Sequence, residues 1–73
     1  MSSKKKPARP TATSIDRNDI AGAVAVAEAA MDDGSWSSDL AGILLKLQDT
    51  PDAYGKAFGA MVRRRRRAGL PTY

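Results

Sequence analysis

The chain of 73 residues carries twelve basic and eight acidic side chains, for a net charge of +4. It contains neither cysteine nor histidine, which excludes a disulfide framework, a thiolate or histidine metal site and the commonest general base of enzymes. Its length allows one domain, and no apolar run approaches the roughly 20 residues of a membrane span. We therefore expect a soluble, cytoplasmic protein that is not an enzyme, binds no cofactor or metal and has no membrane partner.

The first fourteen residues predict a disordered basic arm. Residues 1–14 contain Lys4, Lys5, Lys6 and Arg9 together with two prolines and several small polar residues. Such a composition cannot bury enough apolar surface to offset the entropy lost on ordering. The arm is either a solubilising tail or a segment that contacts phosphates, and the second interpretation is favoured because the other end of the chain is also basic.

Residues 15–70 predict a three-helix domain, and residues 71–73 a C-terminal tail. The first helix is expected to start near Ser14 or Asp16 and to end at about Asp32. Its apolar face repeats at helical spacing. The residues of this face are Ile20, Val24, Ala27 and Met31. Acidic residues at the C-terminal end of a helix oppose its dipole, so this boundary stays open.

A second helix is expected after the connector that contains Trp36, with Ser37 or Ser38 as its N-cap. Trp36 either inserts between helices or forms an exposed platform on which a base stacks, and the first interpretation is favoured. The apolar stripe of this helix is the clearest in the chain. It consists of Leu40, Ile43, Leu44 and Leu47.

A third helix is predicted from Thr50 to Gly69, after a very short turn. Thr50 is a good N-cap, a proline suits the first helical position, and Gly69 is the expected stop. Tyr54, Phe58 and Met61 lie on one face of this helix. Two glycines, at positions 55 and 59, indicate either close approach of another molecule to this helix or a break in it, and close approach is slightly favoured.

Five consecutive arginines end the third helix. Consecutive helical residues advance by about 100°, so these side chains surround the helix axis. We expect the core to end before residue 64 and the helix to project from the bundle as a cationic rod. Arginine binds phosphate without requiring a base sequence, which predicts strong non-specific affinity. A solvated helix end and contact with an acidic protein remain as alternatives.

The charges are basic at both ends of the chain and acidic between them, which indicates a polyanionic partner, most often nucleic acid. The residues expected to bind nucleic acid are Lys4, Lys5, Lys6, Arg9, Lys56, Arg63, Arg64, Arg65, Arg66 and Arg67.

A short amphipathic helix, a brief turn and the runs Ala53–Phe58 and Arg66–Leu70 follow one another between Trp36 and Tyr73. This order resembles the helix pair of winged-helix and related helix-turn-helix DNA-binding modules of small bacterial or phage proteins. In those families the second helix commonly ends in a basic residue, a glycine and a leucine. The resemblance implies a role in binding nucleic acid.

The leading hypothesis is a small DNA-binding protein of a bacterium or bacteriophage, regulatory or architectural, that contacts the phosphate backbone through its third helix. The main alternative is a protein–protein adaptor, such as a phage-encoded modulator or virion component, whose arginine end docks on an acidic partner. RNA ranks third as a partner, and a homodimer is compatible with the sequence.

Overall fold

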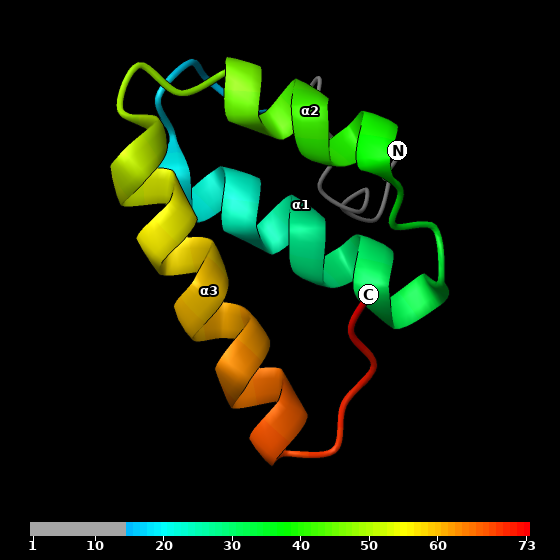
Figure 1. Ribbon diagram of the computed structural model, residues 1–73. Helices are drawn as coiled ribbons and strands as arrows, with labels where there is room; N and C mark the ends of the chain where they lie inside the picture. Colours follow the sequence, from blue (N-terminus) through cyan, green and yellow to red (C-terminus); the bar gives the residue numbers. More distant parts are fainter. Residues whose placement is uncertain (1–14) are drawn as a thin grey trace, which may run out of the picture.

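The computed structural model describes residues 15–73, which form three α-helices and no strand (Figure 1). The helices are α1 (Ile20–Asp33), α2 (Ser38–Lys46) and α3 (Pro51–Arg67). This arrangement confirms the predicted all-α, three-helix fold. The predicted disordered arm of residues 1–14 lies outside the described residues.

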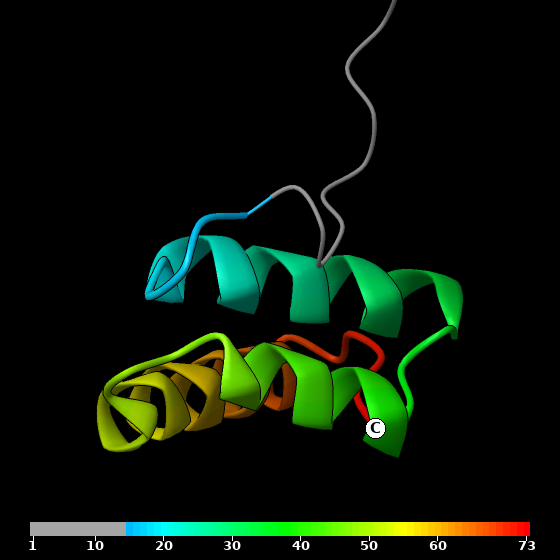
Figure 2. The ribbon, with the colours of Figure 1, turned by 90° about the horizontal axis from the view of Figure 1, so that it is seen from above.

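The helices form two layers. Figure 2 shows α1 alone in one layer, with α2 and α3 side by side in the other. α1 and α3 begin near one another and run in the same general direction, while α2 returns the chain between them (Figure 1). The C-terminal ends of α1 and α3 therefore lie on the same side of the molecule.

The core lies between these two layers. α1 contributes mainly alanines, which bring α3 close but add little transfer free energy. α1 also contributes Met31, and the other layer contributes Leu44 and Met61, which are 0% and 1% exposed. The buried apolar residues are Ala23, Val26, Ala27, Ala30, Met31, Leu44, Tyr54, Met61 and Val62.

α1 starts at Ile20, so the predicted start near Ser14 or Asp16 was wrong. The reason is Asn18, whose φ of 64° is in the left-handed region and cannot continue a right-handed helix. Asp19 then acts as the N-cap, with its carboxylate accepting a hydrogen bond of 2.9 Å from the backbone N–H of Gly22.

Asn18 also fixes the turn between α2 and α3. Its backbone N–H donates to the carbonyl of Leu47 at 2.8 Å, and its side-chain Oδ1 accepts from the backbone N–H of Asp49 at 3.2 Å. The hydroxyl of Thr50 donates to the same Oδ1 at 3.3 Å. Thr50 occupies the predicted N-cap position of α3, but its side chain bonds to Asn18 and does not cap the helix.

α2 begins as predicted, with the Ser37 hydroxyl accepting from the backbone N–H of Leu40 at 3.1 Å. Its apolar stripe is only partly covered. Leu44 is buried, whereas Ile43 is 49% exposed. Leu45, which lies off the stripe, is 46% exposed. The second helix therefore contributes mainly one residue to the core.

α3 ends at Arg67, and the predicted glycine stop follows two residues later. Gly69 has a φ of 76°, its N–H donates to the carbonyl of Arg66, and the N–H of Leu70 donates to the carbonyl of Arg65. These two bonds define a Schellman motif, which turns the chain back on itself.

Residues 71–73 fold back onto the bundle and do not form a separate tail. The ring of Tyr73 lies 5.9 Å from that of Phe58 and 6.3 Å from that of Trp36. Trp36 itself stacks on Phe58 at 5.5 Å. Trp36 is therefore packed against α3, in agreement with the interpretation that it inserts between elements of the fold.

Candidate nucleic-acid interface

The exposed face of α3 carries a row of three cations, Lys56, Arg63 and Arg67. At about 100° per residue, these positions fall within roughly 40° of one another around the helix axis. A rise of 1.5 Å per residue separates the first and last Cα atoms by about 16 Å. We call these three residues the cationic row.

Small residues lie beside the cationic row. A Cβ atom added to Gly59 would lie 3.6 Å from Nη1 of Arg63, so the guanidinium extends back over this glycine. A Cβ atom added to Gly55 would meet open space. α3 is continuous through both positions, so the interpretation of Gly55 as a helix break was wrong. Within residues 15–73 nothing uses the space above Gly55, and a partner that approaches closely stays a prediction.

Arg64 and Arg66 lie on opposite sides of the cationic row. Arg64 faces α1, where its Nη2 atom is 3.7 Å from Oε2 of Glu28 while 64% of its side chain stays exposed. An ion pair this open to solvent contributes little to stability, so the Arg64 guanidinium can exchange partners. Arg66 is exposed on the other side.

Arg65 has a different role, because it is 3% exposed. Its Nη1 atom donates to Oε2 of Glu28 at 3.2 Å, its Nη2 atom donates to Asp32, and its Nε atom donates to the carbonyl of Pro71 at 2.9 Å. The hydrogen bond to Asp32 is the main cause that raises the pKa of Arg65, against a smaller lowering by burial. Arg65 is thus a buried structural residue, and its guanidinium is not exposed for contact with phosphate.

The expectation that the whole arginine run projects beyond the bundle is corrected by this geometry. α1 and α3 run in the same general direction (Figure 1), and Glu28 and Asp32, in the C-terminal half of α1, reach Arg65 near the end of α3. The inward-facing member of the arginine run therefore meets two carboxylates. These contacts also explain why α1 tolerates acids at its C-terminal end, where they oppose the dipole.

The start of α3 is less suited to nucleic acid. Asp52 is exposed in its first turn, one helical turn before Lys56. Its carboxylate repels phosphate close to the position where a recognition helix reads bases. The exposed charges of α3 therefore suit a polyanion better along its middle and end than at its start.

Charge separation, and not net charge, characterises the described part of the chain. The basic residues from position 15 onward are Arg17, Lys46, Lys56 and Arg63 to Arg67, and the acidic ones are Asp16, Asp19, Glu28, Asp32, Asp33, Asp39, Asp49 and Asp52. These charges cancel, so the formal excess of +4 corresponds to Lys4, Lys5, Lys6 and Arg9, which lie outside the described residues.

The described residues contain no group of acidic, histidine or cysteine side chains that could hold a metal ion. None of the three helices is long and apolar enough to cross a membrane. No protein-family model matches the chain, and no curated protein or solved structure matches it. The resemblance to helix-turn-helix modules therefore remains a prediction.

Sequence reasoning missed two residues that shape this surface, Asn18 and Arg65. A signal for Arg65 existed in the sequence, because two acids at the end of α1 require compensation by nearby cations. No comparable local signal marks Asn18. Its left-handed backbone depends on contacts with a turn about thirty residues away, at Asp49.

Proposed function

We propose that this protein binds double-stranded DNA through the phosphate backbone, as a small regulatory or architectural protein. The observation that carries the proposal is the cationic row on the exposed face of α3. Arginine donates two parallel hydrogen bonds to a phosphate, and each neutralised phosphate releases condensed counterions. Arg66 and the exposed Arg64 extend the row to both sides.

The dimensions of a single helix favour DNA over RNA as the partner. An α-helix with its side chains is about 10–12 Å wide, and the major groove of B-DNA is about 12 Å wide. The major groove of A-form RNA is too narrow for such a helix. Small residues beside the cationic row, such as Gly59 and Gly55, let the helix approach the backbone.

The basic residues at the start of the chain strengthen this mode of binding. Lys4, Lys5, Lys6 and Arg9 supply the formal charge excess. Added to a neutral but polarised helical domain, they increase the phosphate contacts that a duplex receives. In this proposal, the arm supplies long-range attraction and α3 supplies the contact surface.

Fluorescence anisotropy with a labelled duplex, measured over a salt series, tests the proposal. The logarithm of affinity should fall linearly with the logarithm of salt, with a slope of about −0.9 per phosphate contact. The double variant Arg63→Gln/Arg67→Gln should bind all duplex sequences more weakly and flatten the slope by roughly two units.

The matched control is Arg17→Gln/Lys46→Gln, which removes the same charge from exposed positions outside α3. It should retain most of the affinity, because only the general attraction is reduced. Equal losses in the two double variants would show that net charge alone drives binding. A protein that does not bind duplex DNA at about 0.15 M salt would contradict the proposal.

A further inference from the structure

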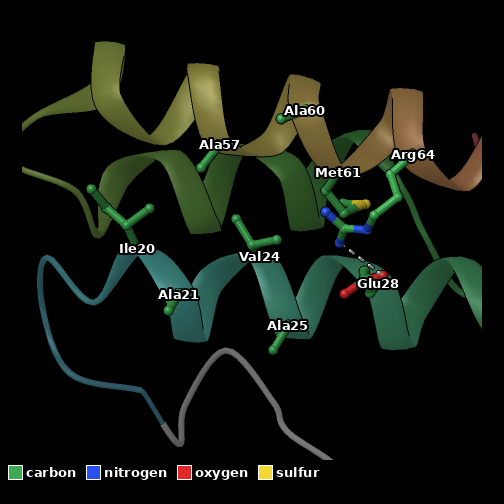
Figure 3. Close-up of a pocket in the computed structure, with 9 residues that line it drawn as sticks. All are labelled: Ile20, Ala21, Val24, Ala25, Glu28, Ala57, Ala60, Met61 and Arg64. Atoms are coloured by element: carbon green, nitrogen blue, oxygen red, sulfur yellow. Dashed lines mark ion pairs between the residues drawn. The ribbon is translucent and has the colours of Figure 1, made fainter.

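The second surface of interest is an open groove between α1 and α3, with a volume of about 600 Å³. Figure 3 shows side chains from both helices meeting along it. Ile20 and Val24 point from α1 towards α3, and Ala57 and Met61 point from α3 towards α1. The lining also includes Ala21, Ala25 and Ala60. Alanine side chains bring two ridges close together but leave a shallow channel, which remains exposed at Ala21, Ala25 and Ala60.

The α1 side of the groove runs from Ile20 to Glu28, a distance of about 12 Å at 1.5 Å per residue. This is the length of slightly more than two helical turns. A channel of that length between α1 and α3 accepts the apolar ridge of a helix from a partner, whose contacting side chains are spaced by three or four residues. An interface this small is typical of transient complexes.

Charge is distributed unequally on the two rims of the groove. On the α3 side, Arg64 lines the end of the groove. Lys56 and Arg67 do not line it, but at about 100° per residue they lie next to Ala60 around the helix, just outside the groove. On the α1 side, the one charged residue that lines the groove is Glu28, which is already in contact with Arg64 and Arg65. A partner in the groove therefore meets unneutralised cations along one edge only.

From this combination we infer that the groove binds an acidic amphipathic helix of another protein. The apolar side of that helix packs against Val24, Ala57 and Ala60, and its carboxylates pair with Lys56, Arg64 and Arg67. A basic or neutral helix lacks this second contribution. The inference is independent of the DNA proposal except in one consequence: the acidic helix and a duplex use the same cations, so they exclude one another.

The probe for this site is a synthetic peptide of about 18 residues, long enough to form a helix in water when rich in alanine. Leucine and alanine occupy one face and glutamate the other. Two companion peptides test the two parts of the inference: one has the same composition in a scrambled order, and the other has lysine in place of glutamate. We expect each companion to bind at least about tenfold more weakly, since each loses one of the two contributions.

The decisive pair of variants is Ala60→Arg and Ala53→Arg. Both replace an exposed alanine of α3 by arginine, a good helix former, and both add one positive charge. Ala60 lines the groove and Ala53 does not. If the peptide lies in the groove, Ala60→Arg should weaken its binding at least about tenfold, whereas Ala53→Arg should preserve or slightly strengthen it.

Measuring duplex affinity and peptide affinity on the same variant shows whether the groove inference or the DNA-binding proposal fails. Ala60→Arg blocks the groove but adds a cation beside the cationic row, so it should preserve or increase duplex affinity while weakening peptide binding at least about tenfold. A scrambled peptide that binds as well as the amphipathic one would overturn the inference, because the groove would then play no part. An Ala60→Arg protein that binds the peptide normally would also overturn it.

Two other occupants of the groove give distinct results. A protein that sediments as a dimer, and as a monomer after Ala60→Arg, has a second copy of itself in the groove. A protein that gains at least about tenfold in peptide affinity on deletion of residues 1–14 has its own arm there. Either result would overturn the assignment to another protein.

Discussion

The guanidinium of Arg65 lies 3.2 Å from the carboxylate of Glu28 and is almost entirely removed from solvent. Its other two nitrogens donate to Asp32 and to the carbonyl of Pro71. One arginine thus joins α1, α3 and the segment after α3. The remaining arginines of the run stay on the surface, so a single run of identical residues has both a structural and a surface part.

Arg65→Gln should lower the melting temperature, whereas Arg63→Gln should leave it nearly unchanged. The first change leaves Glu28 and Asp32 without their buried cation, and the second removes only an exposed charge. Circular dichroism during heating measures both. Duplex affinity should rank the two variants the other way round. At a temperature where both proteins are folded, Arg63→Gln should bind the duplex more weakly than Arg65→Gln. Equal melting temperatures would contradict the structural role of Arg65.

Leu44→Ala should destabilise the protein by about 2–5 kcal/mol, because it creates a cavity at a fully buried position. Leu45→Ala is the matched control: the same change, one residue further along α2, at a side chain that is 46% exposed. We expect its effect to stay below about 1 kcal/mol. Phe58→Ala should fall between the two, since Phe58 is half-buried and stacks on both Trp36 and Tyr73. Urea denaturation gives all three values.

The ends of α2 and α3 were predictable because their signals are local. The Ser37 cap, the proline at the start of α3 and the left-handed Gly69 each act within a few residues. The exposure of Ile43 was not predictable, because helical periodicity identifies a face but not how much of it a neighbour covers. Its side chain is 49% exposed although it continues the apolar stripe of α2.

Part of the candidate site was also predictable, because it depends on local helical spacing. The helical spacing of Lys56, Arg63 and Arg67 follows from the sequence once the helix is known. The burial of Arg65 depends on Asp32, 33 residues earlier in the chain, and on the parallel course of α1 and α3. No pattern local to the arginine run distinguishes its third member from the others.

Tyr54→Phe should remove part of the protein's sensitivity to alkaline pH. Burial raises the pKa of Tyr54 above its ordinary value, because the fold favours the neutral phenol. This stability is fully present below the unfolded pKa of about 10 and is lost as pH rises through the higher folded pKa. Urea denaturation at pH about 8 and about 11 should therefore show a smaller decrease for Tyr54→Phe than for the wild type. Equal decreases would mean that burial of Tyr54 contributes nothing to the alkaline limit.

Asn18 provides the test of how the α2–α3 turn is held. Asn18→Gly keeps the left-handed backbone but removes the side-chain acceptor shared by Asp49 and Thr50, which should cost about 1–2 kcal/mol. Asn18→Ala loses the acceptor and also forces alanine into a φ of 64°, so it should cost about 1–2 kcal/mol more. Hydrogen exchange of the Asp49 amide should accelerate in both variants.

Arg17→Ala is the control for Asn18, because Arg17 reaches the same turn through an ion pair of 3.0 Å with Asp49. Both partners are more than 60% exposed. Such surface pairs contribute about 0–1 kcal/mol, so Arg17→Ala should destabilise the protein less than Asn18→Gly. If the two variants lose equal stability, the ion pair fixes the turn as much as the hydrogen bonds of Asn18 do. If only the Asn18 variants lose stability, the left-handed asparagine is what positions the start of α3, and with it the cationic row.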